Sequence, residues 1–194
     1  MPHPRHERSN RASRMIDWKT RFDTALTFEH FSATVQKNQD LWHGVYRLAA
    51  IPPQIIDRVN ALRCRRHLLI LVEDWCGDAA NIVPPIIRLA ELTSRLDVRL
   101  LGRDANPDIM NAHLTNVSRS IPVAAVLDEQ FVECGWWGPR PRELQRWVLD
   151  IGLAMPSVER YRHIRAWYAR DHARSTLDEL VALIEQCSAT SVAS

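Results

Sequence analysis

Apolar and polar residues follow one another along the chain in blocks that predict a sheet whose strands are separated by helices. Four short apolar runs bounded by turn residues are typical of strands. They comprise residues 67–72, 98–102, 123–127 and 131–136. Segment 77–94, between the first two runs, has apolar residues about 3.6 apart and predicts a helix. Because a helical crossover joins parallel strands, we expect the first two strands to be parallel, whereas residues 128–130 are short enough for an antiparallel hairpin.

Helical spacing continues on both sides of the predicted strands. Before them, helices are expected after Thr27, over residues 41–48 and after the Pro52-Pro53 pair; further helices are expected over 108–114, 141–149, 161–172 and 177–187. We therefore predict one compact unit of the α/β class, a mixed sheet of about four strands flanked by helices, with extra helices at both ends. Its expected parts are a disordered basic tail (1–15), a helical N-terminal extension (16–64), the α/β core (65–152) and a helical C-terminal extension (153–194).

One cysteine occupies the turn between the first strand and the helix that follows it. The turn reads Trp75-Cys76-Gly77-Asp78-Ala79. At a helix N-terminus, unpaired N–H groups and the positive end of the helix dipole favour a thiolate, which is the nucleophile in disulfide and peroxide chemistry. The negative charge of Asp78 opposes this effect. We therefore expect the pKa of Cys76 to lie nearer that of a free thiol, about 8.5, than the strongly acidic values of the most reactive cysteines.

A second signal is the proline that precedes the third apolar run, in Ile121-Pro122. Proline cannot donate to a sheet, so at this position it marks an edge, a first residue or a cis bond. With the cysteine turn, this pattern resembles the thioredoxin superfamily. Pro84 then matches the proline that kinks the active-site helix, and Ile121-Pro122 matches the cis-proline that faces the sulfur. Trp137-Gly138 resembles the end of the last strand, beside the partner groove.

The turn departs from the thioredoxin pattern where the second, resolving cysteine would stand, because that position is Ala79. The whole chain resembles a bacterial branch of thioredoxin-like proteins with this Trp-Cys-Gly-Asp-Ala turn, most strongly over residues 65–150. The resemblance makes Cys76, with Asp78 beside it, the candidate catalytic group. It places the partner groove at Trp75, Gly77, Ile121, Pro122, Trp137 and Gly138.

Two classes of function follow from this resemblance. In the first, Cys76 attacks a disulfide or is oxidised by peroxide, and a small thiol or another protein thiol releases the mixed disulfide, so the expected partners are protein thiols or disulfides, or a small thiol. In the second, the protein is a non-catalytic binding module that kept the groove and lost redox activity. Neither class implies a cofactor or a metal, and we interpret Glu73 and Asp74 as caps and solvated charges rather than cation ligands.

Composition narrows the expected partners and location. A formal charge of +2, from 25 basic and 23 acidic residues, gives no global field that would attract nucleic acid. No apolar stretch approaches the roughly 20 residues of a membrane span, and the N-terminus lacks a secretory apolar region. We therefore expect a soluble cytoplasmic protein with reduced thiols.

The three other cysteines are interpreted as buried small apolar residues: Cys64, Cys134 and Cys187. Cys134 has an alternative role as a distant resolving thiol, because its strand adjoins the one that begins after Pro122. Strand alternation favours the first interpretation, since it places Cys134 in a packed layer with Val132 and Trp136.

Overall fold

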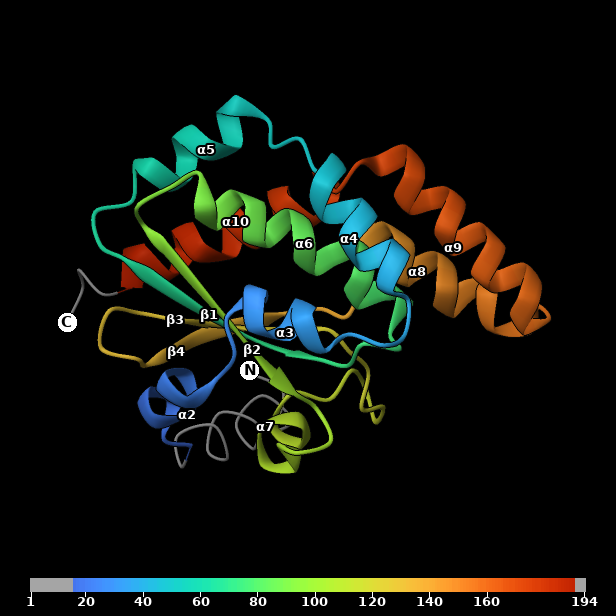
Figure 1. Ribbon diagram of the computed structural model, residues 1–194, viewed down its shortest axis with the longest axis horizontal. Coiled ribbons are helices and arrows are strands. Elements are labelled where there is room, and N and C mark those ends of the chain that lie inside the picture. Colours follow the sequence, from blue (N-terminus) through green and yellow to red (C-terminus); the bar gives the residue numbers. More distant parts are fainter. Residues whose placement is uncertain (1–15, 191–194) are drawn as a thin grey trace, which may run out of the picture.

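A four-stranded mixed sheet lies at the centre of the computed structural model, which describes residues 16–190 (Figure 1). The strands are β1 (Arg66–Val72), β2 (Leu96–Gly102), β3 (Val123–Leu127) and β4 (Glu133–Trp137). Their order is β2-β1-β3-β4, with β1 parallel to β2 and β3 antiparallel to both its neighbours. The predicted fold class is thereby confirmed. The predicted basic tail, 1–15, lies outside the described residues.

Helices cover both faces of the sheet. On one face lie α5 (Pro53–Asn60), α6 (Gly77–Glu91) and α10 (Arg174–Thr190), and on the other lie α2 (Trp18–Thr24) and α7 (Pro107–Ala112) (Figure 1). Every residue of β1 is buried, as expected for a central strand covered on both faces. The buried strands and the inner faces of these helices form one hydrophobic core.

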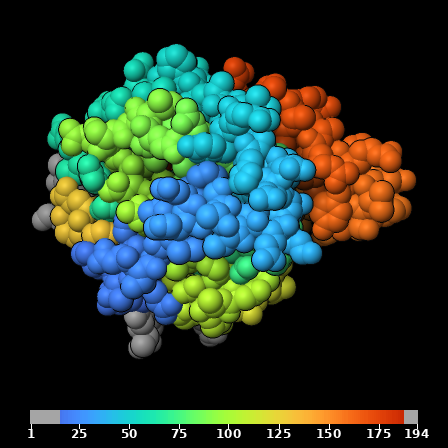
Figure 2. All heavy atoms as spheres, viewed as in Figure 1, coloured from blue at the N-terminus to red at the C-terminus, as the bar shows by residue number. Residues whose placement is uncertain are grey.

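The remaining helices lie around this core. They are α3 (Phe28–Thr34), α4 (Gln39–Leu48), α8 (Arg142–Asp150) and α9 (Ser157–Asp171), with a 3₁₀ turn η1 (Gly152–Ala154) between the last two. Helix α4 packs along α6. The segment that holds α8 and α9 projects at one end, shown in orange in Figure 2. No helix within residues 16–190 is both long enough and apolar enough to cross a membrane.

The N-terminal helix α2 was not predicted, because it is seven residues long and has only two buried side chains. Asp17 begins it by accepting the N–H of Thr20 at 3.0 Å. Its Trp18 ring lies edge-on to His113, the C-cap of α7, with ring centroids 5.8 Å apart, and its Phe22 ring lies edge-on to His67 of β1 with ring centroids 5.0 Å apart. Two aromatic side chains therefore pack α2 against the sheet, and these two alone are too few to form a helical pattern of apolar residues in the sequence.

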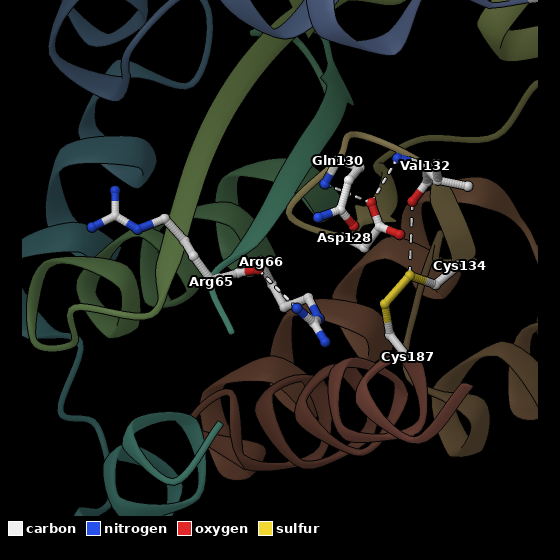
Figure 3. Close-up of a disulfide and its surroundings, with 7 residues drawn as sticks. All are labelled: Arg65, Arg66, Asp128, Gln130, Val132, Cys134 and Cys187. Carbon is white, nitrogen blue, oxygen red and sulfur yellow. Dashed lines mark hydrogen bonds between the residues drawn. A yellow bond between two sulfur atoms is a disulfide. The ribbon is translucent and has the colours of Figure 1, made fainter. Parts of the chain in front are cut away.

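Strand β4 begins at Glu133, two residues later than predicted. The Asp128 carboxylate accepts the backbone N–H groups of Gln130 and Val132, at 2.9 and 2.8 Å, and Phe131 adopts a φ of 61° (Figure 3). This turn uses residues that the apolar pattern had assigned to the strand.

Cys134 and Cys187 form a disulfide between β4 and α10 (Figure 3). The prediction that both are reduced, with Cys134 in a packed layer beside Trp136, is therefore wrong. Gly135 pairs with Val126 and Glu133 pairs with Leu127, so Cys134 is the extra residue of a β-bulge. The bulge breaks the alternation of side chains and turns Cys134 towards α10. Cys64 is a free, partly buried thiol.

Candidate functional site

Cys76 is the N-cap of α6, in the loop that follows β1. Its Sγ accepts the backbone N–H of Ala79 at 3.4 Å. The same sulfur donates to the carbonyl oxygen of Ile121 at 3.5 Å, and the bond between Ile121 and Pro122 is cis. Only 7% of Cys76 is exposed. A sulfur that donates carries its proton, so these contacts describe a thiol.

Burial raises the pKa of the Cys76 thiol from 9.0 to about 11. The N–H of Ala79 lowers this pKa and the Asp78 charge raises it, but both effects are smaller than that of burial. The pKa is far from strongly acidic values, as expected, but the expectation missed the rise above 8.5. It balanced the helix end against one carboxylate and left out desolvation, which a sequence does not reveal.

The Asp78 carboxylate is buried and paired. Arg140 donates to it in a bidentate arrangement, with Nε 3.0 Å from Oδ1 and Nη2 2.5 Å from Oδ2. The Tyr168 hydroxyl of α9 donates to Oδ1 at 2.9 Å, and Arg140 also donates to Gln145 of α8 at 3.0 Å. Burial, with Asp78 adding to it, raises the pKa of Tyr168 well above its usual value. Asp78 therefore joins α6 to the C-terminal helices.

The other two carboxylates of the turn hold neighbouring loops. Asp74 accepts the N–H groups of Gln36 and Lys37 at 2.9 and 3.0 Å, and these bonds lower the pKa of Asp74. Glu73 accepts the N–H of Asp104 at 3.0 Å, in the loop after β2. Both carboxylates therefore hold loops around the cysteine turn, and neither is the N-cap of a helix.

A cavity of about 450 Å³, here called the Cys76 cavity, opens beside the sulfur. Residues 38, 41, 75–78, 81, 103, 118–121, 140, 161, 164 and 165 line it. Of the predicted groove residues, Trp75, Gly77 and Ile121 therefore lie on its wall. Trp75 is 48% exposed and its ring lies under the Arg103 guanidinium at 4.9 Å.

The remaining predicted groove residues pack behind this wall. Gly138 has a φ of 132°, and a Cβ added there would overlap the carbonyl oxygen of Pro122. The Trp137 indole is buried and donates to Glu179 of α10 at 2.9 Å. In the structure, Pro122, Trp137 and Gly138 thus support the site from behind and are not among the residues that line the cavity.

The sequence did not indicate the side chains of α9 that line this cavity, nor its arginines. Tyr161, Ile164 and Arg165 of α9 line the cavity, about 90 residues after Cys76 in the chain. Nothing in the helical pattern of residues 157–171 marks them. Arg119 was the accessible signal, because it stands two residues before the Ile121-Pro122 pair that the sequence pattern marks. Within residues 16–190, no three His, Cys, Asp or Glu side chains gather as a metal site would require.

A parallel pair extended by an antiparallel hairpin, with a cysteine at the N-terminus of the first crossover helix and a cis-proline opposite it, defines a thioredoxin-fold protein. A family model described as thioredoxin matches residues 25–161. The chain therefore belongs to the thioredoxin family.

Two solved structures share the fold. A protein of unknown function from Pseudomonas aeruginosa aligns with a TM-score of 0.69 and 22% identity, over 85% of this chain and 95% of that one. An HIV epitope scaffold aligns with a TM-score of 0.71 and 19% identity, over 88% and 99%. None of the curated proteins matches this sequence.

Proposed function

We propose that this protein captures partners slowly through one cysteine, by thiol–disulfide exchange at Cys76. The observation that carries the proposal is the place of the sulfur: it caps α6, faces the Ile121 carbonyl at 3.5 Å and borders a cavity. An extended partner that enters the cavity meets this sulfur and the backbone before Pro122 together. The expected partners are protein disulfides and small disulfides.

The reaction is a thiol–disulfide exchange with one protein sulfur. Cys76 loses its proton to solvent, and its thiolate attacks one sulfur of a partner disulfide. A bond forms between Cys76 and that sulfur, and the other partner sulfur leaves as a thiolate. A second thiol from solution then attacks the mixed disulfide and returns Cys76 to its reduced state.

A long lifetime of the mixed disulfide follows from where the other cysteines lie. Ala79 occupies the position of a neighbouring resolving cysteine. Cys64 precedes β1 whereas Cys76 follows it, and a strand of this length separates them by roughly 20 Å. The Cys134–Cys187 disulfide also lies at that far end, because β4 pairs there with the end of β3 at Leu127.

The experiment is capture of partners from a cell extract by the Cys64→Ser protein, whose only free thiol is Cys76. Adducts that dithiothreitol releases, and that the double variant Cys64→Ser with Cys76→Ser does not form, support the proposal. Rapid catalytic reduction of insulin disulfides by the Cys64→Ser protein would contradict it, because fast turnover needs a resolving thiol.

The raised pKa of Cys76 favours a second candidate, a binding module without thiol chemistry. At neutral pH nearly all of the sulfur is protonated and buried, and it then serves as the cap of α6. The two candidates differ in their response to Cys76→Ser. A binding module keeps its partners in that variant, whereas a covalent mechanism loses them.

A further inference from the structure

The Cys76 cavity is strongly basic although the chain is nearly neutral. Asp78 is the only acidic side chain on its wall. Four arginines also line it: Arg103, Arg119, Arg140 and Arg165. The whole chain has a formal charge of +2. Positive charge is thus concentrated where a ligand would meet the sulfur, and a cavity lined by one sign of charge raises the local concentration of the opposite sign.

Two of these arginines have carboxylate partners and two do not. Arg140 is paired with Asp78, and Arg103 is paired with Asp104 at 2.8 Å. Arg119 and Arg165 are exposed, and among residues 16–190 neither forms an ion pair. They stand on different sides of the cavity, since Arg119 precedes the cis-proline and Arg165 belongs to α9. Two positive charges on the cavity wall are therefore uncompensated.

The rest of the wall suits a small ligand with apolar parts. Ser118, Ser120 and Asn81 supply uncharged polar groups, while Trp75 and Tyr161 are about half exposed and supply apolar surface. A volume of about 450 Å³ lies in the usual range for small-molecule sites. Guanidinium groups pair with carboxylates in a bidentate geometry, which fixes orientation as well as charge.

We propose that the Cys76 cavity selects small disulfides that carry carboxylate groups, with Arg119 and Arg165 binding the carboxylates. The inference rests on the proposed exchange at Cys76 and names its substrate class. The Cys76 thiolate attacks one sulfur of the small disulfide RSSR, the mixed disulfide of Cys76 and RS forms, and the other RS leaves as a thiolate. The proton of Cys76 goes to solvent, and one disulfide replaces another.

The test compares two small disulfide reagents on the Cys64→Ser protein, where Cys76 is the only free thiol. Dithiobis(nitrobenzoate) carries two carboxylates and dithiodipyridine is uncharged; both release a coloured thiol. Each rate constant is divided by that of the same protein unfolded in urea, which removes intrinsic reactivity. The ratio of the two normalised rates then measures selection for charge.

The informative variant combines Arg119→Gln with Arg165→Gln, and the matched control combines Arg95→Gln with Arg162→Gln. The control arginines are exposed and do not line the cavity, and their substitution removes the same charge. We expect the ratio to fall about tenfold in the cavity variant and to stay constant in the control, because a lost local field acts on the anion alone. Added salt should lower the ratio only where Arg119 and Arg165 are present.

The outcomes separate this inference from the proposed function. If both reagents modify Cys76 and the ratio is the same in all three proteins, exchange stands and selection for carboxylates is wrong. If neither reagent modifies Cys76, the exchange itself is wrong. If the cavity variant does not fold, the test uses glutarate as a competitor in the Cys64→Ser protein. Glutarate is a dicarboxylate without sulfur, and by binding Arg119 and Arg165 it should slow the reaction of dithiobis(nitrobenzoate) with Cys76. No slowing would overturn the selection.

Discussion

The position of Cys76 as a buried helix cap opposes the thiol chemistry that we propose for it. As the cap of α6 it must stay buried beside Ile121, and this burial raises its pKa to about 11. A pKa of about 11 in place of 9.0 leaves roughly a hundredfold less thiolate at neutral pH. We expect iodoacetamide to alkylate the Cys64→Ser protein slowly at pH 7, with a rate that still increases above pH 10. A plateau near pH 8.5 would contradict the buried thiol.

Asp78→Asn extends this prediction to the neighbouring ion pair. It removes a negative charge that raises the pKa of Cys76 and leaves Arg140, whose charge lowers it. The alkylation profile should therefore shift to lower pH. Unfolding in urea should become easier by about 3 to 5 kcal/mol, because the buried guanidinium loses its partner. Asp150→Asn, at the exposed end of α8, is the control and should change neither measurement.

Gly138 tests the support behind the cis-proline. Gly138→Ala places a Cβ against the Pro122 carbonyl at a φ of 132°, which L-residues rarely adopt. We expect a loss of 1 to 3 kcal/mol or more in the free energy of unfolding, of the order of backbone strain. Gly44→Ala is the matched control, because the site is helical and open and alanine should stabilise it by about 0.5 to 1 kcal/mol. Equal effects at both sites would refute the close contact.

At the scale of single residues, the sequence identified Cys76 because its position in a strand-to-helix turn is a local property. The pairing of Asp78 with Arg140 and Tyr168 is not local, since it joins positions 62 and 90 residues apart. No pattern of spacing reports such a contact. The pKa of Cys76 depends on this same packing, and the sequence therefore misjudged it.

Among the elements, α9 depends on one hydroxyl for its polar contact with Asp78. Tyr168→Phe removes that hydrogen bond and keeps the ring, so we expect a loss of about 1 to 2 kcal/mol in the free energy of unfolding. Tyr161→Phe lies on the same helix at an exposed position and should have no measurable effect. Equal stability of the two variants would show that the Tyr168 hydroxyl does not support the ion pair.

The predicted elements were accurate where their signal repeats over many residues. Helix α6 and strand β1 have long apolar patterns, and both lie where the sequence predicts them, although α6 ends at Glu91 rather than at residue 94. Helix α2 has too few buried residues to leave such a pattern. The bulge at Cys134 reverses the facing of one side chain, which alternation cannot foresee.

For the whole molecule, the Cys134–Cys187 disulfide links two positions 53 residues apart. In the chain-entropy model, a crosslink of this span lowers the entropy of the unfolded chain and so raises the free energy of unfolding by about 4 kcal/mol. Cys134→Ser, at the exposed partner, should lower the free energy of unfolding by up to that amount, and dithiothreitol should not lower it further. Cys64→Ser is the control and should match the unaltered protein. An unchanged stability in Cys134→Ser would mean that packing of α10 alone holds the helix in place.

The general architecture was thus predictable from the sequence, whereas the composition of the cavity was not. Family resemblance located Cys76, Ile121 and Pro122, which lie within the core. The charge of the cavity depends on arginines from three loops and from α9, which follows the last strand in the chain. Their convergence is a property of the tertiary fold.

The hydrogen bond from Ala79 to the Cys76 sulfur also gives the molecule a built-in reporter. The amide proton of Ala79 is bound by the Cys76 sulfur, the same atom that would form a disulfide with a captured partner. Solvent exchange of that proton, followed by NMR, should be slow while Cys76 is a thiol and faster once the sulfur has turned outwards into an adduct. The amide of Ala80, held by the Cys76 carbonyl at 3.0 Å, should exchange at the same rate in both states. One pair of neighbouring amides would then report occupancy of the site without a chemical probe attached to the protein.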